Sequence, residues 1–183
     1  MKIDEIKLLY EYNYWANQRI LTTCANVSEE QYIAVTNFGS LRPTVIHILD
    51  SEWSWRLAFQ EHFVAADELE IARASEPKLS SQDELTEADL PTLDSVKARW
   101  QVEEQAMRAY LDSLADGDLN GVVRYLVSEG YVRERVLWHC LVHAVNHGTQ
   151  HRSEAAALLT SYEQSPGGLD FTAFLNEHFN LPS

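Results

Sequence analysis

The stretch WHCLVHAVNHGTQHRSE, residues 138–154, holds four of the seven histidines in the chain. They are spaced four residues apart, at His139, His143, His147 and His151. On an α-helix such neighbours are offset by only about 40° around the axis and rise about 6 Å, so two adjacent imidazoles can reach one point. All four cannot, because the outer pair is about 18 Å apart and turned by about 120°. We therefore predict a helix over about residues 133–162 that carries a chelating pair.

Three more long helices are predicted upstream, because apolar residues recur at helical spacing over about residues 3–26, 41–63 and 92–114. The polar run Ser28-Glu29-Glu30 is expected to follow the end of the first helix, and Ser40 to cap the second. Residues 65–91 are acidic and polar. This segment has the length of a crossover between helices that are not hairpin neighbours, with room for one helical turn.

Two shorter elements are expected on either side of the histidine helix. Residues 121–127 and 131–136 alternate in polarity around Ser-Glu-Gly, which favours a short hairpin whose second half passes directly into the last long helix. Residues 169–179 are predicted to form a short amphipathic helix. The sequence thus predicts an all-α, antiparallel four-helix bundle, a single domain over residues 1–183, in which metal or cofactor sites are built from facing helices.

The charge of the chain excludes several classes of partner. Its 14 Lys and Arg residues against 28 Asp and Glu residues give a net charge of −14. Runs of basic residues are needed to bind nucleic acid or an anionic membrane surface, and the sequence has none, so neither partner is expected. No window approaches the roughly 18 apolar residues of a membrane-spanning helix.

The cysteines and the N-terminal residues indicate a reducing compartment. Cys24 and Cys140 lie far apart and form no CxxC pair, so a disulfide framework is not expected and both are predicted to be small buried residues. The first residues, MKIDEIKLLYEYNYW, contain no apolar stretch of signal-peptide length. The expected location is the cytoplasm.

The histidine spacing points to a divalent metal ion. Two imidazoles one turn apart give two neutral nitrogen ligands on a rigid element, the geometry that the HExxH zinc helix uses. We favour His147 and His151 as this pair, because Gly148 between them is small and lets another helix approach. The pair His139 and His143 is interleaved with larger apolar residues, and His143 is expected either to support a ligand or to lie at the rim of the site.

A third ligand must come from another helix. His47 lies in the apolar run Val-Ile-His-Ile-Leu, residues 45–49. A lone histidine there is more often a core residue, but with a pair on a second helix it becomes the candidate third ligand. Asp50 and Glu154 each follow a proposed ligand by about one turn and are candidates to accept its other ring N–H, and Asn17 could reach the same cavity. The histidines expected on the solvated surface are His62 and His178.

Three motifs make the chain resemble a known family: YNYWANQRIL at residues 12–21, VIHILDSEWSW at residues 45–55, and the HxxxHxxxHR of the last long helix. Together with GLDFTAFL near the end, they resemble the DinB family of four-helix-bundle proteins, which is related to the bacillithiol- and mycothiol-dependent transferases. The resemblance implies that one divalent ion is held by His47, His147 and His151. The family often continues its motif as His-Arg-Gly-Gln, whereas this chain has Ser153-Glu154 after the arginine, so any role of the usual glutamine is open.

The ligand set implies an open and reactive ion. Three neutral imidazoles leave the ion its full charge and at least one free coordination position, where the pKa of water or of a thiol is lowered. Zinc, nickel and iron suit nitrogen ligands. The open site predicts a metal-dependent enzyme that activates either water, as a hydrolase, or a small thiol, as a transferase. The resemblance favours the transferase, with a low-molecular-weight thiol as co-substrate. It also implies a homodimer.

Two other functions remain open at this point. One is a non-catalytic metal-binding or stress-response protein, in which the metal only stabilises the bundle. The other is a helical interaction domain whose histidines are simply buried. A structural zinc normally has four protein ligands, and only three are found here, which favours the open site.

Overall fold

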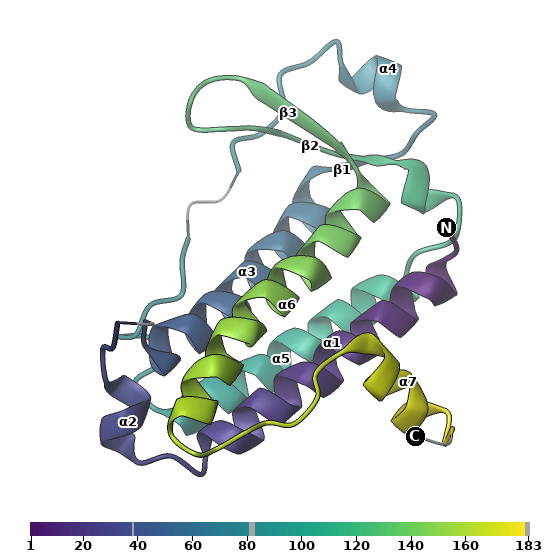
Figure 1. The fold of residues 1–183 in the computed structure, drawn as a ribbon. Coiled ribbons are helices and arrows are strands. Elements are labelled where there is room, and N and C mark those ends of the chain that lie inside the picture. Colours follow the sequence, from purple (N-terminus) through teal and green to yellow (C-terminus); the bar gives the residue numbers. More distant parts are fainter. Residues whose placement is uncertain (38, 81–82, 182–183) are drawn as a thin grey trace.

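Four long helices form the body of the protein (Figure 1). The structure is a computed structural model that describes residues 1–37, 39–80 and 83–181. The long helices are α1 (Ile3–Cys24), α3 (Leu41–His62), α5 (Leu93–Asp112) and α6 (Leu137–Ser161). All four predicted helices are confirmed, but α6 begins at Leu137 rather than near residue 133, because the residues before it belong to a strand.

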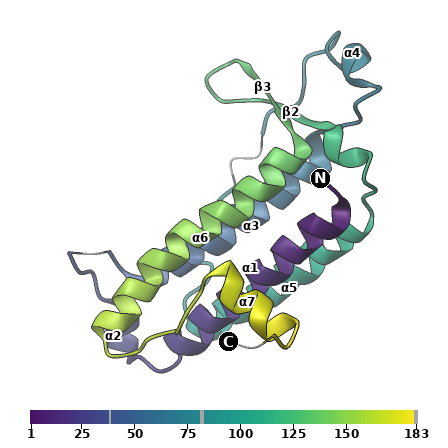
Figure 2. The same ribbon diagram turned by 45° about the vertical axis from the view of Figure 1, so that its right-hand side comes forward.

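Two of the long helices run in each direction. α1 and α6 start at the end of the bundle where a small sheet lies, and α3 and α5 end there (Figure 1, Figure 2). α3 packs against α5 and α6, and α1 packs against the same two helices. Because α3 and α5 are parallel, the chain must return along the whole bundle between them. This return explains the long crossover that the sequence predicted over residues 65–91.

A three-stranded antiparallel sheet closes the end of the bundle from which α6 starts. Its strands are, in spatial order, β1 (Phe63–Val64), β2 (Val122–Leu126) and β3 (Val132–Val136). The predicted hairpin is confirmed as β2 and β3. The short strand β1 was not predicted, because two residues directly after a helix show no strand pattern. Gly121 lets β1 lie close, since a Cβ at this position would be 2.7 Å from the Val64 carbonyl oxygen.

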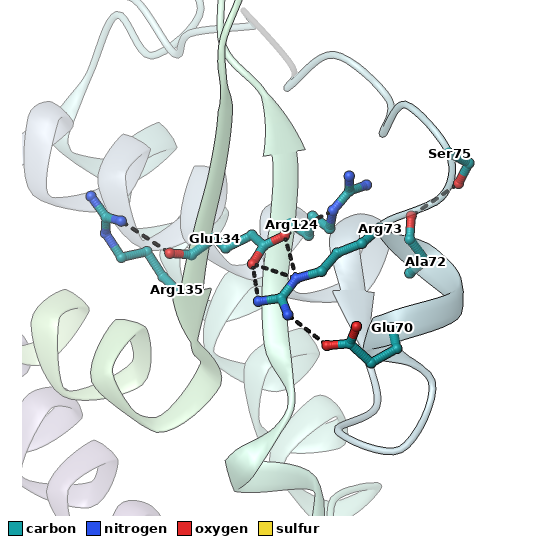
Figure 3. A network of polar contacts seen from close by, with 7 residues as sticks. All are labelled: Glu70, Ala72, Arg73, Ser75, Arg124, Glu134 and Arg135. Carbon is teal, nitrogen blue, oxygen red and sulfur yellow. Dashed lines mark hydrogen bonds and ion pairs between the residues drawn. The ribbon is translucent and has the colours of Figure 1, made fainter.

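The crossover is fastened to the outer face of the sheet. Arg73, which follows helix α4 (Leu69–Ala72), donates through Nη2 to Glu134 Oε2 of β3 at 2.8 Å. The same carboxylate accepts from Nε of Arg124 on β2 at 3.1 Å (Figure 3). Further along, the backbone of residues 78–80 pairs with Leu126 at the end of β2. The crossover is therefore held against β2 and β3 by side-chain and backbone contacts.

Shorter helices complete the fold. Helix α2 (Glu29–Ile33) forms where the sequence predicted only a polar end to α1, and Ser28 caps it by accepting from Gln31 N at 3.2 Å. The helical turn expected in the crossover is α4, and a 3₁₀ turn, η1 (Asp118–Asn120), leads into β2. Helix α7 (Phe171–His178) is the predicted tail helix. In the part of the chain that the structure describes, no helix combines the length and the apolar character needed to cross a membrane.

The apolar core is divided into two clusters by a polar layer. The cluster at the sheet end contains Phe59, Leu137 and Cys140, and the cluster at the other end contains Ile48 and Cys24. Both cysteines are free and buried, as the sequence predicted. Between the clusters the four helices contribute buried polar side chains, which are Asn13, Asn17, Arg56, Glu103 and Arg152.

His62 lies inside the protein, which corrects the surface position predicted for it. Its side chain is 5 % exposed at the end of α3, and its ring is centred 5.7 Å from the ring of Tyr125. Burial lowers the pKa of His62 below its usual value, because the charged imidazole is poorly solvated there. His178 is exposed, as predicted.

Protonation of His62 is expected to make the metal-free protein less stable in mild acid. His62 binds a proton more readily in the unfolded chain than in the folded protein. The stability contributed by neutral His62 is therefore complete above about pH 6.5, the unfolded-state pKa, and is lost as the pH falls through the lower pKa of the folded protein. The urea midpoint should fall between about pH 7 and about pH 5, and it should fall less in His62→Gln. The exposed His178→Gln is the matched control. If the urea midpoint of His62→Gln fell with pH as steeply as that of the wild type, this prediction would be contradicted.

Candidate metal centre

Three imidazoles from two helices meet on one side of the bundle. His47 belongs to α3, and His147 and His151 lie one turn apart on α6, which packs against α3. Each offers one ring nitrogen, and these three atoms lie within 4.8 Å of one another. The ring of His47 is centred 5.1 Å from that of His147 and 4.6 Å from that of His151. The three residues predicted to share an ion are therefore close enough to hold one.

The surroundings of the imidazoles fit a metal ion. Glu154 Oε2 lies 2.8 Å from Nδ1 of His151, which favours the proton on that nitrogen and leaves Nε2 available as a ligand. Nδ1 of His147 is buried and has no hydrogen-bond partner among the described residues, although buried polar atoms normally have one. Burial, together with the neighbouring His151 and His47, lowers the pKa of His147 to about 4. This ring is therefore neutral at neutral pH, as a metal ligand must be.

The histidine cluster is open to solvent. His47 is exposed, and His147 and His151 are partly buried. A pocket of about 270 Å³, partly lined by Trp55 and Tyr125, lies beside His47. The same two aromatic side chains also line a second pocket, of about 350 Å³. Of the three imidazoles, His47 lines the first pocket and none lines the second, so an ion held by them would be open towards the pocket beside His47.

A comparison with known protein families agrees with this geometry. The model of the DinB family matches residues 2–178, which is nearly the whole chain. The chain belongs to the DinB family. It is similar to Protein DinB of Bacillus subtilis (strain 168), with 26 % identity over 171 residues that cover 91 % of each chain. The family inferred from the three sequence motifs is thereby confirmed.

The residues predicted around the ligands of this DinB family protein occupy different places. His143 lies at the rim, exposed, with its ring 6.0 Å from that of His147. Glu154 contacts His151, as described above. Asp50, by contrast, accepts from Leu85 N at 2.7 Å and so ties the crossover to α3 instead of orienting His47. Spacing along a helix could not show this, because the partner of Asp50 comes from the crossover.

Between the helices, the structure reveals a polar network that the sequence analysis did not find, in which Asn13, Asn17 and Arg152 are buried and Glu52 is partly buried. Glu52 accepts from Asn13 Nδ2 at 2.6 Å, from Asn17 Nδ2 at 2.8 Å and from Trp100 Nε1 at 2.9 Å. Arg152, which is 1 % exposed, donates to Oδ1 of the same two asparagines at 2.5 and 2.8 Å. The asparagines of α1 therefore link a carboxylate of α3 to a guanidinium of α6. Asn17, proposed above for the metal cavity, belongs to this network.

Hydrogen bonds within the network stabilise the charged forms of Glu52 and Arg152 between the helices. Burial raises the pKa of Glu52 and lowers the pKa of Arg152, since each charged form is deprived of water. The asparagine bonds and the opposite charge counter this effect at both groups. The signal in the sequence was two amides four residues apart in an aromatic stretch of α1, which places both on one helix face.

Gly148 makes room for this network. A Cβ at this position would lie 2.7 Å from Arg152 Nη1 and 3.1 Å from Asn13 Oδ1. Replacing Gly148 by Ala is therefore expected to lower the free energy of unfolding by about 1–3 kcal/mol, although alanine is the better helix former. Urea denaturation measures the effect. The control is Asn146→Ala at an exposed position of α6, which should be neutral or slightly stabilising. If Gly148→Ala is as stable as the wild type, Arg152 is not fixed in this position.

Proposed function

We propose that the protein is a metal-dependent enzyme that activates a small thiol, or water, at the three-histidine site. The observation that supports this most strongly is the meeting of three imidazole ligands at an opening to solvent. A divalent ion with three neutral ligands keeps its charge and at least one free coordination position, and there it lowers the pKa of a thiol or of water. Zinc, nickel and iron are the ions that suit these ligands.

The ligand count favours a reactive site over a structural one. A structural zinc usually has four protein ligands. Among the residues that the structure describes, no further His, Cys, Asp or Glu joins His47, His147 and His151. The remaining position is therefore left to a molecule from solution.

The thiol in the proposed reaction must come from a second molecule. Burial raises the pKa of Cys140 to about 11 and that of Cys24 to about 12, so both side chains stay protonated and unreactive. Neither belongs to the group of ligands. A low-molecular-weight thiol is the co-substrate that we propose. The two free, buried thiols also support our proposal of a cytoplasmic location, and we further propose a homodimer without nucleic-acid or membrane partners.

In the proposed transfer, the thiol releases its proton to solvent at the open side of the site. Its sulfur forms a bond to an electrophilic carbon, and the bond from that carbon to the leaving group breaks, so that the leaving group departs with the electron pair. Trp55 and Tyr125 provide an apolar wall beside His47 for the reacting molecules. Glu154 holds His151 in one orientation. With water as the nucleophile, the same steps give hydrolysis.

The test is a conjugation assay with reconstituted protein. Zinc-, nickel- and iron(II)-loaded samples are incubated with bacillithiol, mycothiol or glutathione and an aryl chloride, and conjugate and chloride are measured. We expect both products to form in equal amounts, to require the metal, and to be lost in His47→Ala. Metal binding without conjugation or hydrolysis in any of these samples would overturn the proposal and favour the non-catalytic role.

A further inference from the structure

Two arginines of the sheet have no acidic partner among the residues that the structure describes. Arg133 and Arg135 alternate with Glu134 along β3, so their side chains lie on the opposite face of the sheet from that of Glu134. On the Glu134 face, its carboxylate pairs with Arg73 and Arg124, and Glu70 pairs with Arg73 as well. Figure 3 shows Arg135 pointing away from these two arginines. On the other face, no carboxylate of the described residues pairs with Arg133 or Arg135; Arg133 donates to a tyrosine hydroxyl, and Arg135 to the carbonyl of Glu134.

These two arginines line the pocket of about 350 Å³ together with His139 and His143. A guanidinium has five N–H donors. Arg135 uses one of them on the Glu134 carbonyl, so most of its donors remain for a ligand. Arg133 bonds two tyrosine hydroxyls and its Nε is buried, so it offers fewer donors but the same charge. Among the described residues, no Asp or Glu lines this pocket. In a chain with a net charge of −14, the pocket is thus a local group of cations and hydrogen-bond donors without acids. Such a group favours the binding of an anion.

The pocket is next to the proposed metal centre. Trp55 and Tyr125 line both this pocket and the one that contains His47. Along α6, His139 precedes the ligand His147 by eight residues, which corresponds to about 12 Å of helix. A ligand that extends over this distance can therefore reach the histidine cluster with one end and the arginines with the other.

We infer that the pocket is a binding subsite for the carboxylate end of an elongated small molecule. Arg133 and Arg135 bind the carboxylate, Trp55 and Tyr125 contact the chain of the molecule, and its thiol lies at the three-histidine site. The thiol end of this assignment rests on the proposed function. The carboxylate end rests on the pocket alone and can be tested without any metal.

The test compares matched ligands by calorimetry. With metal-free protein, octanoate should bind at least about tenfold more tightly than octanol, since a hydrogen bond to a charged group is worth about this much. The preference should disappear in Arg133→Gln/Arg135→Gln and shrink in Arg135→Gln, whose exposed side chain is the safer substitution for folding. Arg42→Gln, at the far end of α3, changes the net charge by the same amount as Arg135→Gln and should keep the full preference. Equal binding of octanoate and octanol by the wild type would overturn the inference.

A second comparison separates this inference from the proposed function. Mercaptooctanoate should bind zinc-loaded protein more tightly than octanoate does, because the thiol adds a contact at the histidine site. If octanoate depends on the arginines but the thiol adds no affinity after zinc loading, the carboxylate subsite stands and the thiol chemistry is refuted. If the thiol adds affinity but the double arginine variant binds mercaptooctanoate as well as the wild type, the subsite is refuted.

Discussion

Replacing His151 by Ala is expected to lower the affinity of the protein for zinc by more than about 100-fold. Loss of a residue that merely supports a ligand typically weakens metal binding by about 10–100-fold, and here one of three protein ligands itself is lost. Competition with a fluorescent chelator measures the affinity, and elemental analysis should give about one ion per wild-type chain.

Two further variants test whether the loss is specific to the site. His178→Ala removes an exposed histidine of α7 and should leave zinc binding unchanged. Glu154→Ala should have an intermediate effect of about tenfold, because it removes the partner of His151 Nδ1 but no ligand. Equal losses in His151→Ala and His178→Ala would mean that zinc binds elsewhere.

The largest effect on stability is expected at Arg152. Arg152→Ala should lower the free energy of unfolding by about 3–5 kcal/mol, because it leaves the Glu52 carboxylate in the bundle without a compensating charge. It also leaves Oδ1 of Asn13 and of Asn17 without their donor. Urea denaturation at neutral pH, monitored by circular dichroism, measures this loss.

The double variant Arg152→Ala/Glu52→Gln tests whether the unpaired charge of Glu52 causes this loss. Removing both charges should recover part of the stability lost in Arg152→Ala, because no unpaired charge then remains. Lys7→Ala, which breaks the surface ion pair with Asp112, should cost no more than about 1 kcal/mol. A loss below about 1 kcal/mol in Arg152→Ala would show that the buried network does not hold the helices together.

The long helices could be predicted because their apolar residues recur over many turns. The shorter elements depend on contacts that periodicity does not record. Strand β1 exists because Gly121 lets Phe63 and Val64 lie beside β2, and α6 starts at Leu137 because the five residues before it pair with β2. Helix α2 was missed because its acidic first turn looked like the polar end of α1, although Ser28 and Gln31 form a capping box.

The histidine cluster was accessible from the sequence for a physical reason. The four-residue spacing defines chelating pairs, and Gly148 favoured His147 and His151 among them. His47 was a candidate as a histidine in an apolar run of another helix, and the family resemblance supported it. The partners of polar residues were harder to predict, because Asp50 and Glu52 form their bonds to other elements of the chain. Arg152 lay inside the recognised motif, yet its spacing alone could not show that it points into the bundle.

The position of Arg152 directly after His151 has a consequence for how an ion is taken up. Successive helix residues point about 100° apart, so one residue faces the open side while the next is locked between the helices. Any rotation of α6 that spread the imidazoles would have to break the bonds to Asn13 and Asn17. The site is therefore preorganised when the chain folds. Binding of the metal ion should leave the backbone almost unmoved. The rate of binding should be set by the rate at which the ion loses its hydration water.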